Sequence, residues 1–207
     1  MKPSDYDENI FVNCPFDRNY SSIFNAIVFA ICHCGFNVRC ALEEPDSSEN
    51  RLSRIMNIIS ECKYSVHDIS RTEIDTNTQL PRFNMPLELG IFLGAKKFGN
   101  RLHKTKNCLI LDTRAYRYRQ SVSDIAGLDI DYHNNSSKKA IISVRNWLAS
   151  ASGYRRLQSG SFIYRDYLDF KKELPSLCNQ CNLNRTELIF PDYNYLANEW
   201  IIQKNQP

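Results

Sequence analysis

The sequence predicts a three-layer α/β protein, in which helices cover both faces of a parallel sheet of about five strands in the flavodoxin-like order. Two observations carry this prediction. Short apolar runs alternate with helical patterns along the first 151 residues. The run KNCLILD, at 106–112, is apolar enough for a strand that is covered on both faces. Strands that alternate with helices imply right-handed crossovers, and therefore a parallel sheet.

Each element of the predicted sheet follows from its own pattern. Strands are expected at 9–14, 36–42, 64–70, 106–112 and, with a weaker pattern, 127–132. Helices are expected at 21–34, after the capping-box pair Asp46 and Glu49, at 85–98 and at 136–151. The segment 71–83 is polar, contains Pro81, and is expected to be a loop.

The chain is expected to have two parts. Residues 1–151 form an α/β domain of the kind that binds nucleotides, and residues 152–207 form a helical extension that packs on it. Helical patterns at 162–174, ending at Pro175, and at 192–203 indicate the extension. Its aromatic residues either cover the core or dock a partner. Core covering is preferred, because exposed aromatic patches are uncommon on monomers.

Charge and hydrophobicity exclude two classes of partner. The chain carries 26 Lys and Arg against 23 Asp and Glu, a net charge of +3, without a basic cluster, so no nucleic acid is expected to bind. The polar N-terminus lacks the apolar segment of a secretory signal, and no apolar run approaches the ~20 residues that span a bilayer. We therefore expect a cytoplasmic protein without a membrane partner.

The eight cysteines are interpreted as reduced thiols. Five of them lie in apolar segments, where a free cysteine behaves as a small hydrophobic residue: Cys32, Cys34, Cys40, Cys62 and Cys108. Cys178 and Cys181 form a CxxC motif, but no second CxxC or CxxH lies near it in the sequence. Because structural zinc usually needs four ligands at short spacings, no metal is expected.

Three common motifs are absent. The chain has seven glycines, with no GxGxxG after the first strand and no GxxxxGK[ST]. Neither the dinucleotide fingerprint nor the phosphate loop is therefore present. GxSxG is also missing, so the nucleophile elbow of an α/β-hydrolase is not expected.

Polar and aromatic residues follow the predicted strands at the edge where open parallel sheets bind ligands. We take as candidate binding residues Asn13, Phe16, Asp17, Asp68, Ser70, Arg71, Arg82, Phe83 and Asn84. Six of them have a second interpretation. Asp68 can cap the loop that follows its strand, and Asn84 can be the N-cap of the next helix. Arg71 and Arg82 can be ordinary surface residues, and the rings of Phe16 and Phe83 can cover the sheet. His67 and Cys14 are interpreted as core residues.

Glu88 is the most informative residue of the chain. It is the only charged side chain in the segment 85–95 and shares a helical stripe with Ile91, Phe92 and Ala95. Burying an unpaired carboxylate is costly. We expect an active-site carboxylate in the first turn of its helix, kept ionised by the helix end. A helix cap is the alternative.

The segments FVNCPFD, CGFNVRCALE, SVHDISR and PRFNMPLELGIFLGA resemble bacterial Toll/interleukin-1 receptor (TIR)-like proteins, and are similar to the related nucleoside 2-deoxyribosyltransferase superfamily. The resemblance covers about residues 8 to 113. Its most specific element is ELG at a helix start. In the deoxyribosyltransferases a catalytic glutamate lies in such a segment, and Glu88 matches it. Where those enzymes have an upstream acid and a DxG, this chain has Arg82-Phe83-Asn84.

The resemblance implies an NAD-processing enzyme. Many TIR-like enzymes cleave the bond between ribose and nicotinamide with a helix-borne glutamate, and some produce cyclised ADP-ribose signals in antiphage defence. NAD is then a substrate rather than a cofactor, and a homo-oligomer is expected. Two alternatives stay open. One is a nucleoside or nucleotide N-glycosidase or deoxyribosyltransferase; the other is a non-enzymatic module that binds a nucleotide or self-associates.

Overall fold

The computed structural model describes residues 5–43, 48–72, 82–153 and 156–206. Its centre is an all-parallel sheet with the order β2-β1-β3-β4-β5, which confirms the predicted flavodoxin-like α/β fold. The strands are β1 (Asn9–Asn13), β2 (Asn37–Arg39), β3 (Tyr64–Asp68), β4 (Asn107–Asp112) and β5 (Ile130–Tyr132). β1 and β3 are buried along their whole length, as expected for central strands covered on both faces.

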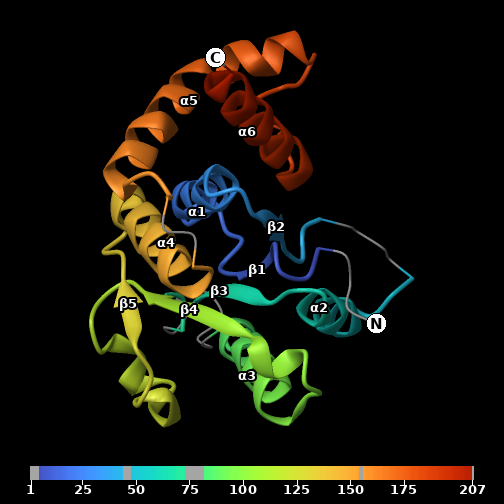
Figure 1. Ribbon diagram of the computed structural model, residues 1–207, viewed down its shortest axis with the longest axis vertical. Helices are drawn as coiled ribbons and strands as arrows, with labels where there is room; N and C mark the ends of the chain where they lie inside the picture. Colours follow the sequence, from blue (N-terminus) through green and yellow to red (C-terminus); the bar gives the residue numbers. More distant parts are fainter. Residues whose placement is uncertain (1–4, 44–47, 73–81, 154–155, 207) are drawn as a thin grey trace.

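Helices cover both faces of the sheet (Figure 1). α1 (Ser21–His33) and α4 (Ser137–Ala151) lie on one face, and α2 (Arg51–Ser60) and α3 (Asn84–Phe98) lie on the other. Each face has its own apolar cluster. Val12 of β1 packs toward α1, whereas Phe11, its neighbour in sequence, packs toward α2 and α3. Alternating side chains of one strand thus reach opposite layers.

The bounds of β2 and the cap of α2 differ from the sequence prediction. β2 has three residues instead of the expected 36–42. It stops because the chain turns after Arg39: the Glu43 carboxylate accepts hydrogen bonds from Cys40 N and from the Arg39 guanidinium. The predicted capping box is also wrong. α2 is capped by Asn50, whose side chain accepts from Leu52 N at 2.8 Å, and Asp46 lies outside the described residues.

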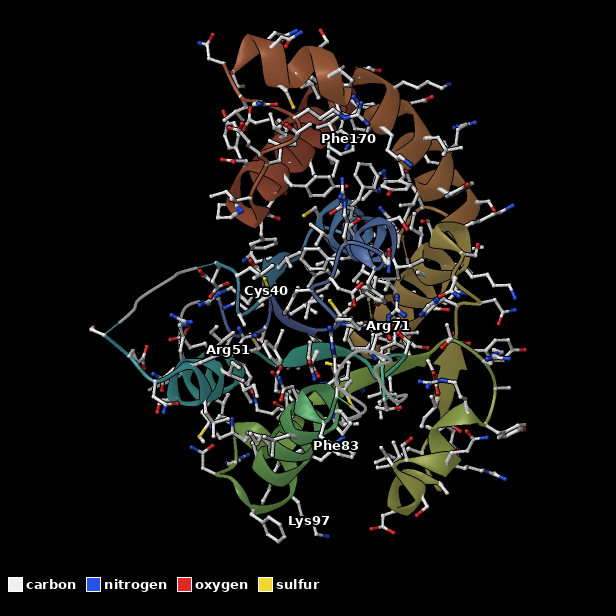
Figure 2. The ribbon with its side chains drawn as sticks, turned by 180° about the vertical axis from the view of Figure 1, so that it is seen from behind. Cys40, Arg51, Arg71, Phe83, Lys97 and Phe170 are labelled. Carbon is white, nitrogen blue, oxygen red and sulfur yellow. The ribbon has the colours of Figure 1, made fainter. Side chains whose placement is uncertain are left out.

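The C-terminal segment forms two helices, α5 (Gly160–Gln180) and α6 (Phe190–Asn205), which lie over α1 on its side away from the sheet (Figure 1). Phe170 of α5 stacks on Phe29 of α1 with ring centroids 5.3 Å apart. It also meets Trp200 of α6 at 5.8 Å, at the junction of the three helices in Figure 2. α1 is therefore buried on both sides, which explains why its sequence is apolar nearly all round.

The predicted stop at Pro175 is wrong, because α5 continues through it to Gln180. A proline inside a helix costs about 3 kcal/mol, since it removes a hydrogen bond and crowds the preceding turn. Here the residues on both sides of it, Leu174 and Cys178, are buried in the core cluster. Tertiary packing thus keeps the helix intact past the proline.

A buried carboxylate joins the extension to α1. Asp166 of α5 is 3 % exposed. Its Oδ2 lies 3.0 Å from His33 Nε2 of α1, and its Oδ1 accepts from Lys204 Nζ of α6 at 2.9 Å. These contacts and the apolar cluster hold the two helices on the α/β core.

The described residues also form three short 3-10 helices: η1 (His103–Thr105), η2 (Arg117–Gln120) and η3 (Ser123–Ile125). η1 precedes β4, and η2 and η3 lie between β4 and β5. Across the residues that the structure describes, no helix has the length and apolar character needed to cross a membrane.

Candidate functional site

The carboxyl ends of β1 and β3 lie side by side, with Asn13 opposite His67 in the register. The buried thiol of Cys14, just after β1, marks the centre of this region. Burial raises its pKa well above the usual value, and the nearby carboxyl groups of Asp68, Glu88 and Asp17 add to the rise. Cys14 is thus a protonated core thiol, and three of the predicted site residues surround it.

Glu88 is the fifth residue of α3, which places it in the second turn. The prediction of a first-turn position is wrong, because the helix starts at Asn84 and Leu87 N already donates to Phe83 O at 2.9 Å. The structure describes α3 in full, and its first turn holds no acidic residue. Glu88 therefore lies beyond the free N–H groups that a capping carboxylate would accept from.

Glu88 is a buried residue, and its carboxyl group has no partner among the residues that the structure describes. The residue is 7 % exposed, on the stripe with buried Phe92. Among the described residues, no hydrogen bond or ion pair reaches its carboxyl oxygens. Burial raises the pKa of Glu88 from 4.5 to about 7, and the positive charge of Arg51, at the start of α2, opposes this rise. We predicted that the helix end keeps Glu88 ionised, but burial has the larger effect and favours the protonated form.

Asn13 connects the end of β1 to the start of α3. Its Nδ2 donates to Met85 O at 2.8 Å, three residues before Glu88, and lies 2.9 Å from His67 Nδ1. Because an amide nitrogen donates, His67 accepts at Nδ1 and carries its proton on Nε2. Burial lowers the pKa of His67 to about 3, so the ring is neutral. Its Nε2 has no hydrogen-bond partner within the described part of the chain.

Asp68 is fully buried at the end of β3 and is well satisfied. Tyr20 Oη donates to its Oδ2 at 2.6 Å, and Ser70 N donates to its Oδ1 at 2.9 Å. His133 Nε2 also lies 2.9 Å from Oδ2, although its N–H is not aligned as a hydrogen bond. Asp68 thereby ties together the start of α1, the loop after β3 and the loop after β5. This arrangement favours a positioning role.

A charged bridge spans the loops above the strand ends. Asp17 Oδ2 lies 3.7 Å from Arg71 Nε and 3.5 Å from Arg82 Nη1. At these distances, and with side chains 41 % and 47 % exposed, both ion pairs contribute only about 0–1 kcal/mol. Both side chains are thus partly exposed to solvent, on a side of the molecule where an arginine can meet an anionic ligand. Figure 2 shows Arg71 near the middle of the molecule.

The remaining candidates differ in exposure. Phe16 packs edge-on against Phe24 with centroids 5.3 Å apart and touches the apolar clusters of both faces, so it covers the core. Phe83 is 57 % exposed at the start of α3 (Figure 2). Asn84 is exposed and is the first helical residue. The alternative that Asn84 is the N-cap is wrong, because Phe83 occupies that position.

The candidates do not converge on one cavity. A polar cavity of about 560 Å³ lies between the ends of β3 and β4 and the N-terminal ends of α1 and α4; its lining includes Ser70, Arg71 and Arg114. A second cavity, of about 710 Å³, lies beside Phe16 and Asp17. Glu88 is not among the described residues that line either cavity.

Several residues of this region escaped the sequence analysis. Tyr20 and His133 reach Asp68 from distant parts of the chain, and no sequence pattern marks either one. Arg51 approaches Glu88 from another helix. Asn134 and Asn135 could have been found from the sequence. They line the polar cavity, and their backbone is left-handed, with φ of 50° and 55°. Consecutive asparagines before a helix are typical of this left-handed conformation.

The donor set for a metal ion is poor. Within the described ranges, no cluster of three or more His, Cys, Asp or Glu side chains could hold a metal ion. All eight cysteines are free thiols, including Cys178 and Cys181.

No protein-family model, curated protein or solved structure matches this chain. The function must therefore be inferred from the geometry of the site and from the sequence pattern.

Proposed function

We propose that the protein cleaves the N-glycosidic bond of NAD, with Glu88 as the catalytic carboxylate, as in the TIR-like enzymes that its sequence resembles. The observation that carries the proposal is Glu88 itself. It is a buried carboxyl group with no hydrogen bond or ion pair among the described residues, and its pKa is raised to about 7. A group that costs stability and lacks a structural partner is a candidate for function.

The chemistry needs one carboxylate. Nicotinamide is a cationic leaving group in NAD. When the bond between C1′ and the ring nitrogen breaks, the electron pair goes to that nitrogen and neutralises it, so no general acid is required. Ionised Glu88 stabilises the oxocarbenium-like ribose or captures C1′ as an ester. Water then gives ADP-ribose and a proton, whereas attack by an adenine nitrogen gives cyclic ADP-ribose and a proton.

The surrounding charges suit a dinucleotide. Arg71 lines the polar cavity together with Arg114, and this pair can hold the pyrophosphate. Arg82 is half-exposed above the same strand ends, and the exposed ring of Phe83 is available for stacking on a base. Asn13 positions Glu88 through its hydrogen bond to Met85 O. Asp68 positions the loops through its hydrogen bond from Tyr20. Asn13 and Asp68 are thus positioning residues.

A second function is favoured by the raised pKa of Glu88. Near neutral pH, part of the protein carries a protonated Glu88. A protonated carboxyl can act as a general acid, which a neutral base leaving from a nucleoside requires. N-glycosidic cleavage or deoxyribosyl transfer on a nucleoside is therefore the alternative reaction. The two reactions have opposite pH dependence.

The test is the release of nicotinamide from NAD by the purified full chain, followed by chromatography. Glu88→Gln keeps the size of the side chain and removes the carboxylate. We expect it to slow release at least about 100-fold, because removal of an electrostatic contact to the transition state typically costs this much. Glu8→Gln is the matched control, since Glu8 is exposed at the opposite end of β1. Equal rates in both variants would remove Glu88 from the mechanism.

Concentration and products extend the same assay. Release per protein molecule that rises with protein concentration is expected if a homo-oligomer is the active form. The co-product separates hydrolysis, which gives ADP-ribose, from cyclisation, the reaction by which related enzymes produce signals in antiphage defence.

A further inference from the structure

The C-terminal helices do more than cover α1: they form one wall of the 710 Å³ cavity. Tyr167 and Lys171 come from α5, and Phe190 and Tyr193 come from α6. The opposite wall is the loop after β1 and the first turns of α1. This volume lies within the range of small-molecule sites, about 300–1,000 Å³. The cavity would not exist without the extension.

The floor of the cavity is aromatic and held in place. Phe24 of α1 lies 5.8 Å from the ring of Phe190. Tyr193 Oη donates to Asn25 O at 3.1 Å, and Tyr167 Oη donates to Ser22 O at 3.4 Å. The two tyrosine rings are thus anchored to the backbone of α1, so a flat ligand ring would meet side chains that are already ordered.

The rim of the cavity is cationic. Arg18, Lys171 and Arg185 are exposed and line it from three different segments. None of them forms an ion pair within the described part of the chain; Lys171 lies over the Tyr167 ring at 5.6 Å. Among the described lining residues the single acid is Asp17, which already faces two arginines. The rim therefore carries an uncompensated positive charge above an apolar floor.

We propose that this cavity binds a small anion that carries a flat aromatic ring, of the class of a nucleoside diphosphate. The aromatic floor packs against the ring, and the three cations donate charge-assisted hydrogen bonds to the phosphate oxygens. The site lies beyond the proposed function, because Glu88 is not among its described lining residues and ligand binding requires no bond cleavage. The extension thereby makes a binding site of its own.

The experiment is calorimetric titration of the full chain with ADP. Charge reversal at the rim, Lys171→Glu or Arg185→Glu, should weaken binding at least about tenfold, because each removes a charge-assisted contact. Lys172→Glu is the matched control: Lys172 is the next residue of α5, is not among the residues that line the cavity, and within the described ranges its ion pair is an exposed one with Asp169. It should leave ADP binding within about twofold. Inorganic pyrophosphate should bind at least about tenfold more weakly than ADP, since it lacks the ring.

Each contrary outcome overturns the proposal. Failure of ADP to bind would show that the cavity is only a packing gap. Pyrophosphate binding as tightly as ADP would deny a role to the aromatic floor. Loss of binding in Arg114→Glu but not in Lys171→Glu would place the ligand in the polar cavity instead. ADP has no nicotinamide bond to cleave, so its binding is measured independently of NAD cleavage, and failure of NAD cleavage and failure of this proposal can be distinguished.

Discussion

Replacing Glu88 by glutamine is predicted to stabilise the protein at alkaline pH. In the unfolded chain the Glu88 carboxyl ionises with a pKa of 4.5, whereas burial raises the pKa to about 7 in the fold. The folded state therefore prefers the protonated form. Stability associated with this proton is fully present below pH 4.5, decreases as the pH rises, and is lost above about pH 7.

The size of the effect follows from the two pKa values. At about 1.4 kcal/mol per pH unit, ionising Glu88 costs the folded state about 3 kcal/mol by pH 8.5 and less than about 1 kcal/mol at pH 5. Glutamine cannot ionise, so the Glu88→Gln protein does not lose this stability as the pH rises. The stability difference between Glu88→Gln and the parent chain should thus grow by about 2–3 kcal/mol between pH 5 and pH 8.5.

Urea denaturation at both pH values measures this difference. The denaturation midpoint of Glu88→Gln should move above that of the parent chain as the pH rises. The exposed Glu8 provides the control, because Glu8→Gln should show the same difference from the parent at both pH values. A Glu88→Gln difference that does not change with pH would refute the reasoning that Glu88 is buried without a compensating partner.

Two further substitutions test the electrostatics. Arg51→Ala should raise the pKa of Glu88 further, because Arg51 favours the ionised form; carboxyl NMR titration measures it, and Lys97→Ala, at the far end of α3 in Figure 2, should leave it unchanged. A lower pKa in Arg51→Ala would contradict the account. Asp166→Asn should lower the free energy of unfolding by about 2 kcal/mol, because it breaks a largely buried ion pair with α6. Asp169→Asn, at 3.5 Å from the same lysine and 39 % exposed, should cost less than about 0.5 kcal/mol in urea denaturation, and equal losses would refute this distinction.

The sheet could be predicted because its information is local. Apolar runs such as that of β4, and the helical stripes between them, are visible within a few residues of sequence. The polar residues at the ends of β1 and β3 follow directly, since parallel strands end at one edge. The burial of Glu88 was also predictable, because it is the lone charge on an apolar stripe.

What the sequence could not show depends on contacts between distant segments. Tyr20 and His133 meet at Asp68 only because the topology places their loops together. The pKa of Glu88 depends on how completely the neighbouring layers exclude water, which its position in α3 does not reveal. Pro175 misled the prediction for a similar reason: the local cost of a proline is known, but the packing of Leu174 and Cys178 that offsets it is tertiary.

The pH dependence of nicotinamide release tests the central claim most directly. The account predicts that kcat/KM for NAD rises with pH through a midpoint near 7, the pKa of Glu88 in the free protein, and that Glu88→Gln loses this activity at every pH. Activity that falls as Glu88 ionises would indicate a general acid and favour the nucleoside reaction. NAD cleavage by Glu88→Gln at the rate of the parent chain, or no cleavage by the parent chain at any protein concentration, would contradict the account.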